Sequence, residues 1–269
     1  MSGSFGVPGF GDGAYTGSSF TEMLRRHRPD LLPETRLSGA DLASLGPQIE
    51  ATTVLAIRWG SGVVMAGDRR ATEGSQISQR RIRKVFPADE FSAVAIAGVA
   101  GMAMELVRLF QTELEYYEKA EGISLSLDGK ANHLAQMVRN HLPLAMQGLA
   151  VVPLFCGYEP RTGEGGIYQY DVVGGRYQEA GYHATGSGGG PARAYLKRRA
   201  DPAMTLDAAV RLAVAALGEA ADEDSGTGGV DEEREIYPVV AVVDEERYRE
   251  LADEDVAAAW QAVKDEVLG

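Results

Sequence analysis

The chain has 269 residues, 45% of them hydrophobic, which suits one large domain with a sizeable core. Its formal net charge of −13 argues against a nucleic-acid partner or an anionic membrane surface. A single cysteine excludes an internal disulfide and a thiolate metal site. No apolar run has the length of a membrane span, and the N-terminus lacks the basic and apolar regions of a secretory signal. These features predict a cytoplasmic protein.

The first 51 residues differ in character from the rest. Residues 1–19 are rich in glycine and serine, a composition typical of disordered segments. Residues 20–50 contain a short basic patch, Arg25-Arg26-His27-Arg28, but too few apolar residues for a core. We therefore predict a leader of residues 1–51, removed on maturation, and a folded domain of residues 52–269.

The folded domain alternates between groups of strands and groups of helices. Its first strand is rich in β-branched and apolar residues without strict alternation, as expected for a strand covered on both faces. Pro143 predicts a kink in the second long helix. In chain order we predict strands at residues 53–59, 63–66, 84–86 and 91–97, helices at 102–119 and 129–149, strands at 150–156, 166–173 and 177–184, helices at 192–199 and 205–221, a strand at 236–243 and a helix at 245–267. Grouped strands and helices indicate an α+β fold with a mostly antiparallel sheet.

The first strand begins abruptly after the leader, at Thr52-Thr53. A threonine hydroxyl is a poor nucleophile until a base takes its proton. The residue's own α-amino group, with a pKa of about 7.7–8.0, can serve as that base, but only after the preceding peptide bond is cut. A leader ending at Ala51 is what this chemistry requires. The alternative is a purely structural role for the two threonines, because threonine has high strand propensity and is common at strand starts.

Neighbouring residues favour the catalytic interpretation. Asp68 places a carboxylate at the end of the second strand, and Lys84 places a cation at the start of another. Gly98 follows an apolar run and leads into a long helix, where a backbone N–H can stabilise an oxyanion.

Several of these motifs together resemble the β subunit of the 20S proteasome, in particular the bacterial type of actinobacteria. They are Thr52-Thr53, residues 62–72, Arg83-Lys84-Val85 and Ile96-Ala97-Gly98, in matching order and spacing, and the resemblance extends from residue 52 to about residue 243. It implies the N-terminal nucleophile hydrolase fold, a four-layer α-β-β-α sandwich of two mostly antiparallel sheets between helix layers. It also implies a threonine endopeptidase that needs no cofactor and no metal.

The resemblance assigns a role to individual residues. Thr52 matches the nucleophile, Asp68 and Lys84 match the pair around it, and the N–H of Gly98 matches the oxyanion donor. Ser187 matches a serine close to the threonine amine, Asp224 a supporting carboxylate, and Thr227 a position where the family often has serine. One departure is Ala51, since the family usually has glycine before the nucleophile; a Cβ there can slow self-cleavage between Ala51 and Thr52.

The resemblance also implies a substrate groove. The backbone of Thr72 matches a position that pairs with the extended substrate as an added strand. The pocket for the side chain before the cut would be lined by Ala71, Ile82, Phe86, Ile96, Ala100 and Met104. None of these residues is charged, so we expect cleavage after apolar residues.

The implied partners are further subunits. Two stacked seven-membered β rings would be capped by rings of α subunits, and the active threonines would face an enclosed chamber. Substrates would be unfolded proteins, often tagged with a small ubiquitin-like protein and delivered by a ring-shaped ATPase.

Two alternatives remain. The chain could be a non-catalytic structural subunit of the same fold, or an N-terminal nucleophile hydrolase acting on small amides. Nucleotide binding at the glycine-rich loop 186–190 is disfavoured because the Walker lysine is missing. The four histidines show no metal-ligand spacing.

Overall fold

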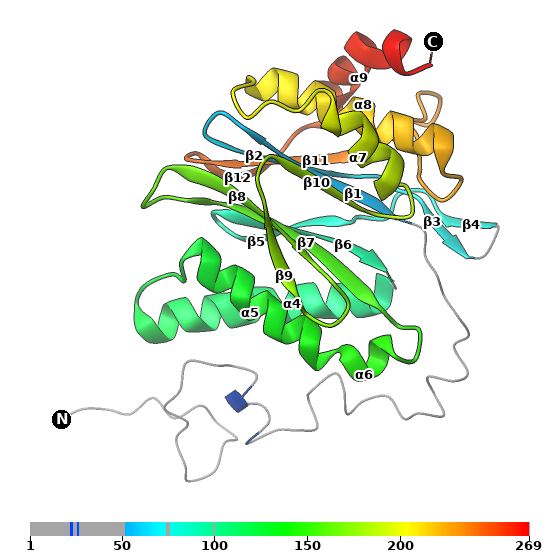
Figure 1. Cartoon of the computed structure of the whole chain (residues 1–269). Helices are drawn as coiled ribbons and strands as arrows, with labels where there is room; N and C mark the ends of the chain where they lie inside the picture. The colour runs from blue at the N-terminus through cyan, green and yellow to red at the C-terminus, as the bar shows by residue number, and fades with distance from the viewer. Residues whose placement is uncertain (1–21, 24–25, 27–51, 74–75, 99, 269) are drawn as a thin grey trace.

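The computed structural model describes residues 22–23, 26, 52–73, 76–98 and 100–268. The described chain forms four layers, in which two β-sheets lie face to face between two layers of helices (Figure 1). This confirms the predicted α+β sandwich. The predicted leader falls outside the described residues, apart from residues 22–23 and 26.

The first sheet has five strands in the order β10-β1-β2-β11-β12, and each neighbouring pair is antiparallel. Its strands are β1 (Thr53–Trp59), β2 (Gly62–Gly67), β10 (Tyr182–Gly186), β11 (Val239–Asp244) and β12 (Arg247–Glu250).

The second sheet also has five antiparallel strands, in the order β5-β6-β7-β8-β9. Its strands are β5 (Val85–Asp89), β6 (Ser92–Gly98), β7 (Val151–Glu159), β8 (Glu164–Tyr170) and β9 (Arg176–Glu179). A separate two-stranded hairpin is formed by β3 (Ala71–Glu73) and β4 (Gln76–Gln79).

Each sheet is covered by its own helices, as Figure 1 shows. The first sheet is covered by α7 (Gly189–Lys197), α8 (Leu206–Glu223) and α9 (Asp253–Leu268), and the second by α4 (Ala100–Glu121), α5 (Leu127–Asn140) and the short α6 (Leu142–Ala145). None of the helices in the described part of the chain is long and apolar enough to cross a membrane.

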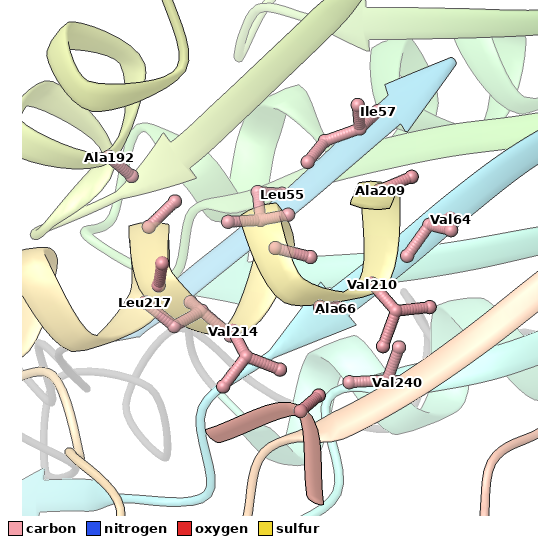
Figure 2. Close-up of a cluster of buried hydrophobic side chains, with 14 of the residues drawn as sticks. Leu55, Ile57, Val64, Ala66, Ala192, Ala209, Val210, Val214, Leu217 and Val240 are labelled. Atoms are coloured by element: carbon pink, nitrogen blue, oxygen red, sulfur yellow. The ribbon is translucent and has the colours of Figure 1, made fainter. Parts of the chain in front are cut away.

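The core consists of three apolar clusters, which explains why the central strands lack polar alternation. Successive side chains of a strand point to opposite faces. Leu55 and Ile57 of β1 therefore pack under α8 (Figure 2), while Val54 and Ala56 pack between the two sheets. Because both faces are buried, both sets of positions are apolar.

Helix starts follow local side-chain chemistry. Thr205 accepts a hydrogen bond from the N–H of Ala208 and so caps α8, and Ser126 accepts one from the N–H of Gly129 and caps α5. Each cap satisfies a backbone donor that has no partner inside the helix.

The single kinked helix predicted at residues 129–149 is wrong. The structure has two helices, with α5 ending at Asn140 and α6 starting at Leu142, one residue before Pro143. Pro143 has no N–H to donate to the carbonyl of Arg139, four residues earlier, and its ring clashes with that carbonyl. The chain therefore breaks at His141 rather than bending.

The single strand predicted at residues 177–184 is also wrong. Its first half is β9, which pairs with β8 in the second sheet, and its second half is β10, which pairs with β1 in the first sheet. The chain changes sheets at residues 180–181. A two-residue hydrophobic period is the same in both sheets, so it does not reveal such a change.

The helix predicted from residue 245 starts later, at Asp253, because residues 247–250 form β12. Arg249 donates to both carboxylate oxygens of Asp244, at 2.6 and 2.7 Å, and fastens this hairpin. The charged run Glu245 to Glu250 favours helix by composition, whereas pairing with β11 decides its structure. The hairpin β3–β4 was not predicted.

Candidate active site

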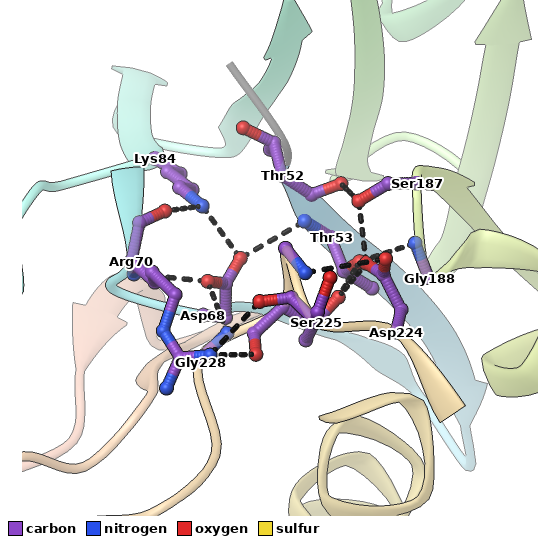
Figure 3. A network of polar contacts seen from close by, with 12 residues as sticks. Thr52, Thr53, Asp68, Arg70, Lys84, Ser187, Gly188, Asp224, Ser225 and Gly228 are labelled. Atoms are coloured by element: carbon purple, nitrogen blue, oxygen red, sulfur yellow. Dashed lines mark hydrogen bonds and ion pairs between the residues drawn. The ribbon is translucent and has the colours of Figure 1, made fainter. Parts of the chain in front are cut away.

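Thr52 lies immediately before β1, and the turn between β10 and α7 holds its backbone (Figure 3). The carbonyl of Thr52 accepts a hydrogen bond of 2.8 Å from the N–H of Ser187. Gly186 has φ +99°, and a Cβ at this position would lie 1.8 Å from the Thr52 oxygen. Only glycine can therefore make this turn.

Asp68 and Lys84 form a buried ion pair beside Thr52. The Lys84 Nζ lies 2.6 Å from Asp68 Oδ1, and the two side chains are 4% and 0% exposed. Asp68 follows β2 of the first sheet and Lys84 precedes β5 of the second, so the pair joins the two sheets. The ammonium also donates to the carbonyl of Arg70 at 2.5 Å.

The Asp68 carboxylate is held by backbone donors as well. The N–H groups of Thr53, Arg70 and Gly228 each donate to it at 2.9 Å. Four donors on two oxygens leave little freedom for the carboxylate to rotate, and they compensate its charge in the absence of water.

A second polar cluster lies on the other side of Thr52. Ser187 and Thr227 both donate to the same oxygen of Asp224, each at 2.6 Å. Burial raises the pKa of Asp224, but the hydrogen bonds from Ser187 and Thr227, with those from backbone N–H groups, outweigh it and lower the pKa below its ordinary value.

Arg70 connects the loop after α8 to the Asp68–Lys84 pair. Its guanidinium donates to the carbonyls of Ser225 and Thr227, at 3.0 and 3.1 Å, while its backbone N–H bonds Asp68. Gly228 packs close to this arginine, because a Cβ at Gly228 would lie 2.8 Å from the Cβ of Arg70.

Gly98 closes the end of β6. It has φ +126°, and a Cβ at this position would lie 2.2 Å from the carbonyl oxygen of Ala150. The N–H of Ile96, two residues earlier, donates to the carbonyl of Lys84, which immediately precedes β5. Alternate N–H groups of a strand point to the same side, so the N–H of Gly98 is directed to the side of Lys84 and Thr52.

Thr52, Lys84 and Gly98 line one small cavity together with apolar side chains. The full lining is Thr52, Ile82, Arg83, Lys84, Phe86, Ile96, Gly98, Ala103 and Met104. Four of the six residues predicted for the specificity pocket, Ile82, Phe86, Ile96 and Met104, are among them.

The other predicted substrate residues lie differently. Ala71 is buried and does not line this cavity, and the side chain of Ala100 is outside the described part of the structure. Thr72 lies in β3, opposite Ile77 of β4. The cavity also contains a cation that the prediction left out, Arg83, which is paired with Glu250.

The sequence prediction missed Thr53, Gly188 and the loop contacts of Arg70. The N–H of Gly188 donates to Thr53 Oγ1 at 2.9 Å, and Thr53 Oγ1 lies 2.6 Å from Thr227 Oγ1. The only signal was the doubled threonine, which strand propensity explains equally well. Among the described residues, no three His, Cys, Asp or Glu side chains are grouped to hold a metal ion.

Two packed sheets between helix layers place the chain in the class of four-layer α+β sandwiches. In this fold, Thr52 lies between a buried ion pair and a hydroxyl–carboxylate cluster. A family model described as proteasome subunit matches residues 49–233, and the chain belongs to this family. Its similarity is to the β type. It is 57% identical over 227 residues to a proteasome subunit beta of Acidimicrobium ferrooxidans, a match that covers 82% of this chain and 83% of the relative.

Proposed function

We propose that the chain is a catalytic proteasome β subunit, a threonine endopeptidase whose nucleophile is Thr52. The observation that carries the proposal is the buried Asp68–Lys84 ion pair, because Lys84 lines the same cavity as Thr52. A buried lysine–carboxylate pair is costly to desolvate, and such groups are commonly found where chemistry requires them.

The reaction begins when Thr52 Oγ1 attacks the carbonyl carbon of a substrate peptide. The α-amino group of Thr52 takes the hydroxyl proton and passes it to the departing amine, leaving the acyl part of the substrate as an ester on Thr52. A water molecule then attacks the ester while the same amine accepts its proton. The bond from the acyl carbon to Oγ1 breaks, the acyl part leaves as a carboxylic acid, and the amine returns the proton to Oγ1 of Thr52.

Lys84 and Gly98 stabilise charge during these steps. The ammonium of Lys84 favours the deprotonated oxygen of Thr52, and Asp68 fixes the ammonium in place. The N–H of Gly98 donates to the oxygen that becomes negative in the tetrahedral intermediate. Removing one such donor typically costs about 10²- to 10³-fold in kcat.

The α-amino group exists only after the bond between Ala51 and Thr52 is broken. We therefore propose that residues 1–51 are a propeptide that masks the nucleophile, and that residues 52–269 are the mature peptidase. The same hydroxyl of Thr52 performs this first cleavage.

The cavity next to Thr52 would accept the side chain before the cut. Ile82, Phe86, Ile96 and Met104 make it apolar, and the charge of Arg83 is engaged by Glu250. We propose a preference for apolar residues at this position.

Membership of the proteasome family implies assembly. We propose two stacked seven-membered β rings capped by α-subunit rings, acting in the cytoplasm on unfolded or ubiquitin-like-tagged proteins that a ring-shaped ATPase delivers.

The decisive experiment is the intact mass of the chain, co-expressed with its α partner and compared with Thr52→Ala. We expect the wild type alone to lose residues 1–51. An unprocessed wild type in a complete particle would instead support the non-catalytic structural subunit. Restored processing in Ala51→Gly would then identify Ala51 as the cause.

A further inference from the structure

We propose that Thr53, the residue after the nucleophile, is a positioning residue that fixes the direction of the proton donors around Asp224 and thereby the orientation of Ser187 toward Thr52. This inference rests on the proposed peptidase function. It gives the second threonine a role beyond its preference for strand conformation.

Thr53 contacts both polar clusters of the site. Its backbone N–H donates to Asp68 at 2.9 Å, and its side-chain oxygen lies 2.6 Å from Thr227 Oγ1. The same side-chain oxygen accepts a hydrogen bond of 2.9 Å from the N–H of Gly188. Thr53 is completely buried, so these contacts do not compete with bulk water.

The direction of each hydrogen bond follows from counting protons. An ionised carboxylate only accepts, so the single proton of the Thr227 hydroxyl is used on Asp224. Between Thr53 and Thr227, the proton must therefore come from Thr53. The order of donors runs from the N–H of Gly188 to Thr53, then to Thr227, then to Asp224.

The same count applies to Ser187. Its one proton is used on Asp224 at 2.6 Å, which is much shorter than the 3.4 Å to the carbonyl oxygen of Thr52. The oxygen of Ser187 therefore keeps its lone pairs available to accept a hydrogen bond from the released amine of Thr52. Ser187 and Thr227 share Oδ2 of Asp224, so the alignment of one hydroxyl depends on the other.

In Thr53→Val a methyl group takes the place of the hydroxyl and leaves no added space for a water molecule. A Cβ on Gly188 would lie 2.6 Å from Thr53 Oγ1 and 2.5 Å from Thr227 Oγ1, so the three groups are already in close contact. Without the hydroxyl, the buried N–H of Gly188 has no acceptor, and Thr227 loses the donor that orients it.

The test compares Thr53→Val, which keeps the shape and removes the hydroxyl, with Thr53→Ser, which keeps the hydroxyl. Both are made in the full chain, co-expressed with the α partner, and assayed on an apolar fluorogenic peptide across pH. We expect Thr53→Val to lower kcat by about 10- to 100-fold, the range typical of residues that orient the reacting groups without contacting the substrate. KM should stay within about twofold, because ground-state binding is unchanged.

Two further readouts separate positioning from mere packing. The acid limb of the kcat/KM profile reports the amine of Thr52 as general base, and it should move to lower pH in Thr53→Val, because a misaligned Ser187 stabilises the ammonium form less. Thr53→Ser should restore both kcat and the pH profile. Wild-type kcat and an unchanged profile in Thr53→Val would overturn the proposal.

If Thr53→Val does not assemble, Thr227→Val interrupts the same chain of hydroxyls one step later. Wild-type kinetics in that variant would overturn the proposal equally. A wild-type chain that neither loses its leader nor cleaves peptide contradicts the proposed function itself, and Thr53 then has no reaction to position. If the wild type is active and Thr53→Val has the same kinetics, only the proposed role of Thr53 is contradicted, and the proposed function stands.

Discussion

Lys84 Nζ lies 2.6 Å from Asp68 Oδ1, and this contact joins the ends of the two sheets. Each residue alone would be a buried charge without its counter-charge. Breaking such a pair by removing one partner typically costs about 3–5 kcal/mol in the free energy of unfolding. The pair therefore links the proposed active site to the packing of the sandwich.

Asp68→Ala should both inactivate and destabilise the protein. It removes the carboxylate that neutralises the ammonium of Lys84 and accepts from three backbone N–H groups, and we expect a loss of about 3–5 kcal/mol in urea unfolding. Lys119→Ala is the matched control, because its ion pair with Glu115 is exposed and should change stability by less than about 1 kcal/mol. Equal effects of the two variants would contradict the buried pair.

Lys84→Met should separate catalysis from stability. Methionine has a similar volume, and the backbone N–H groups of Thr53, Arg70 and Gly228 still hold Asp68. We expect peptide hydrolysis and loss of the leader to fall at least about 10²-fold, while stability falls less than in Asp68→Ala. Hydrolysis close to the wild-type rate would remove Lys84 from the mechanism.

Gly98→Ala should be far more damaging than Gly101→Ala, three residues further on. At Gly98 the added Cβ meets the carbonyl oxygen of Ala150 at 2.2 Å with a positive φ, whereas nothing lies within 4 Å of a Cβ at Gly101. The first variant must shift the end of β6, so we expect lost hydrolysis and a lower melting temperature. The second should be neutral or slightly stabilising, by up to about 1 kcal/mol.

Enlarging the cavity should change substrate choice. Ile96→Ala and Met104→Ala each remove side-chain volume from its lining, so cleavage after large aromatic residues should rise relative to cleavage after leucine. A panel of fluorogenic peptides measures the ratio. Faster wild-type cleavage after Arg or Asp than after Leu or Tyr would contradict an apolar pocket.

Stability should depend on pH through His183. Burial, helped by Arg193, lowers the pKa of His183 to about 4, although Glu179 at 3.4 Å acts in the opposite direction. The unfolded chain takes up this proton near pH 6.5, so stability falls as the pH falls from about 6.5 to about 4. His183→Gln should flatten the unfolding free energy in this range. An unchanged slope would mean that other groups dominate.

Much of the fold and of the site follows from local sequence. The strand ends that carry Asp68, Lys84 and Gly98 are marked by apolar runs stopping at polar or glycine residues, and the structure brings these residues together around Thr52. The apolar character of both faces of β1 also predicted a strand buried between layers.

The remaining features depend on distant partners. The change of sheet between β9 and β10 is set by pairing with β8 and β1, and β12 exists because β11 offers it an edge. The side-chain oxygen of Thr53 contacts residues on the loop after α8 and immediately before α7. No periodicity within a short window contains that information.

The polar cluster around Thr52 combines residues from opposite ends of the chain. Thr53 contacts Thr227, 174 residues later, and Asp68 accepts a hydrogen bond from Gly228, 160 residues later. A nascent chain on the ribosome contains Thr52 long before it contains the groups that contact it. If Thr52 is the nucleophile, as proposed, the chain would therefore stay inactive throughout synthesis even with an early loss of the leader, and would become competent only when the C-terminal third of the chain has folded onto the first strand.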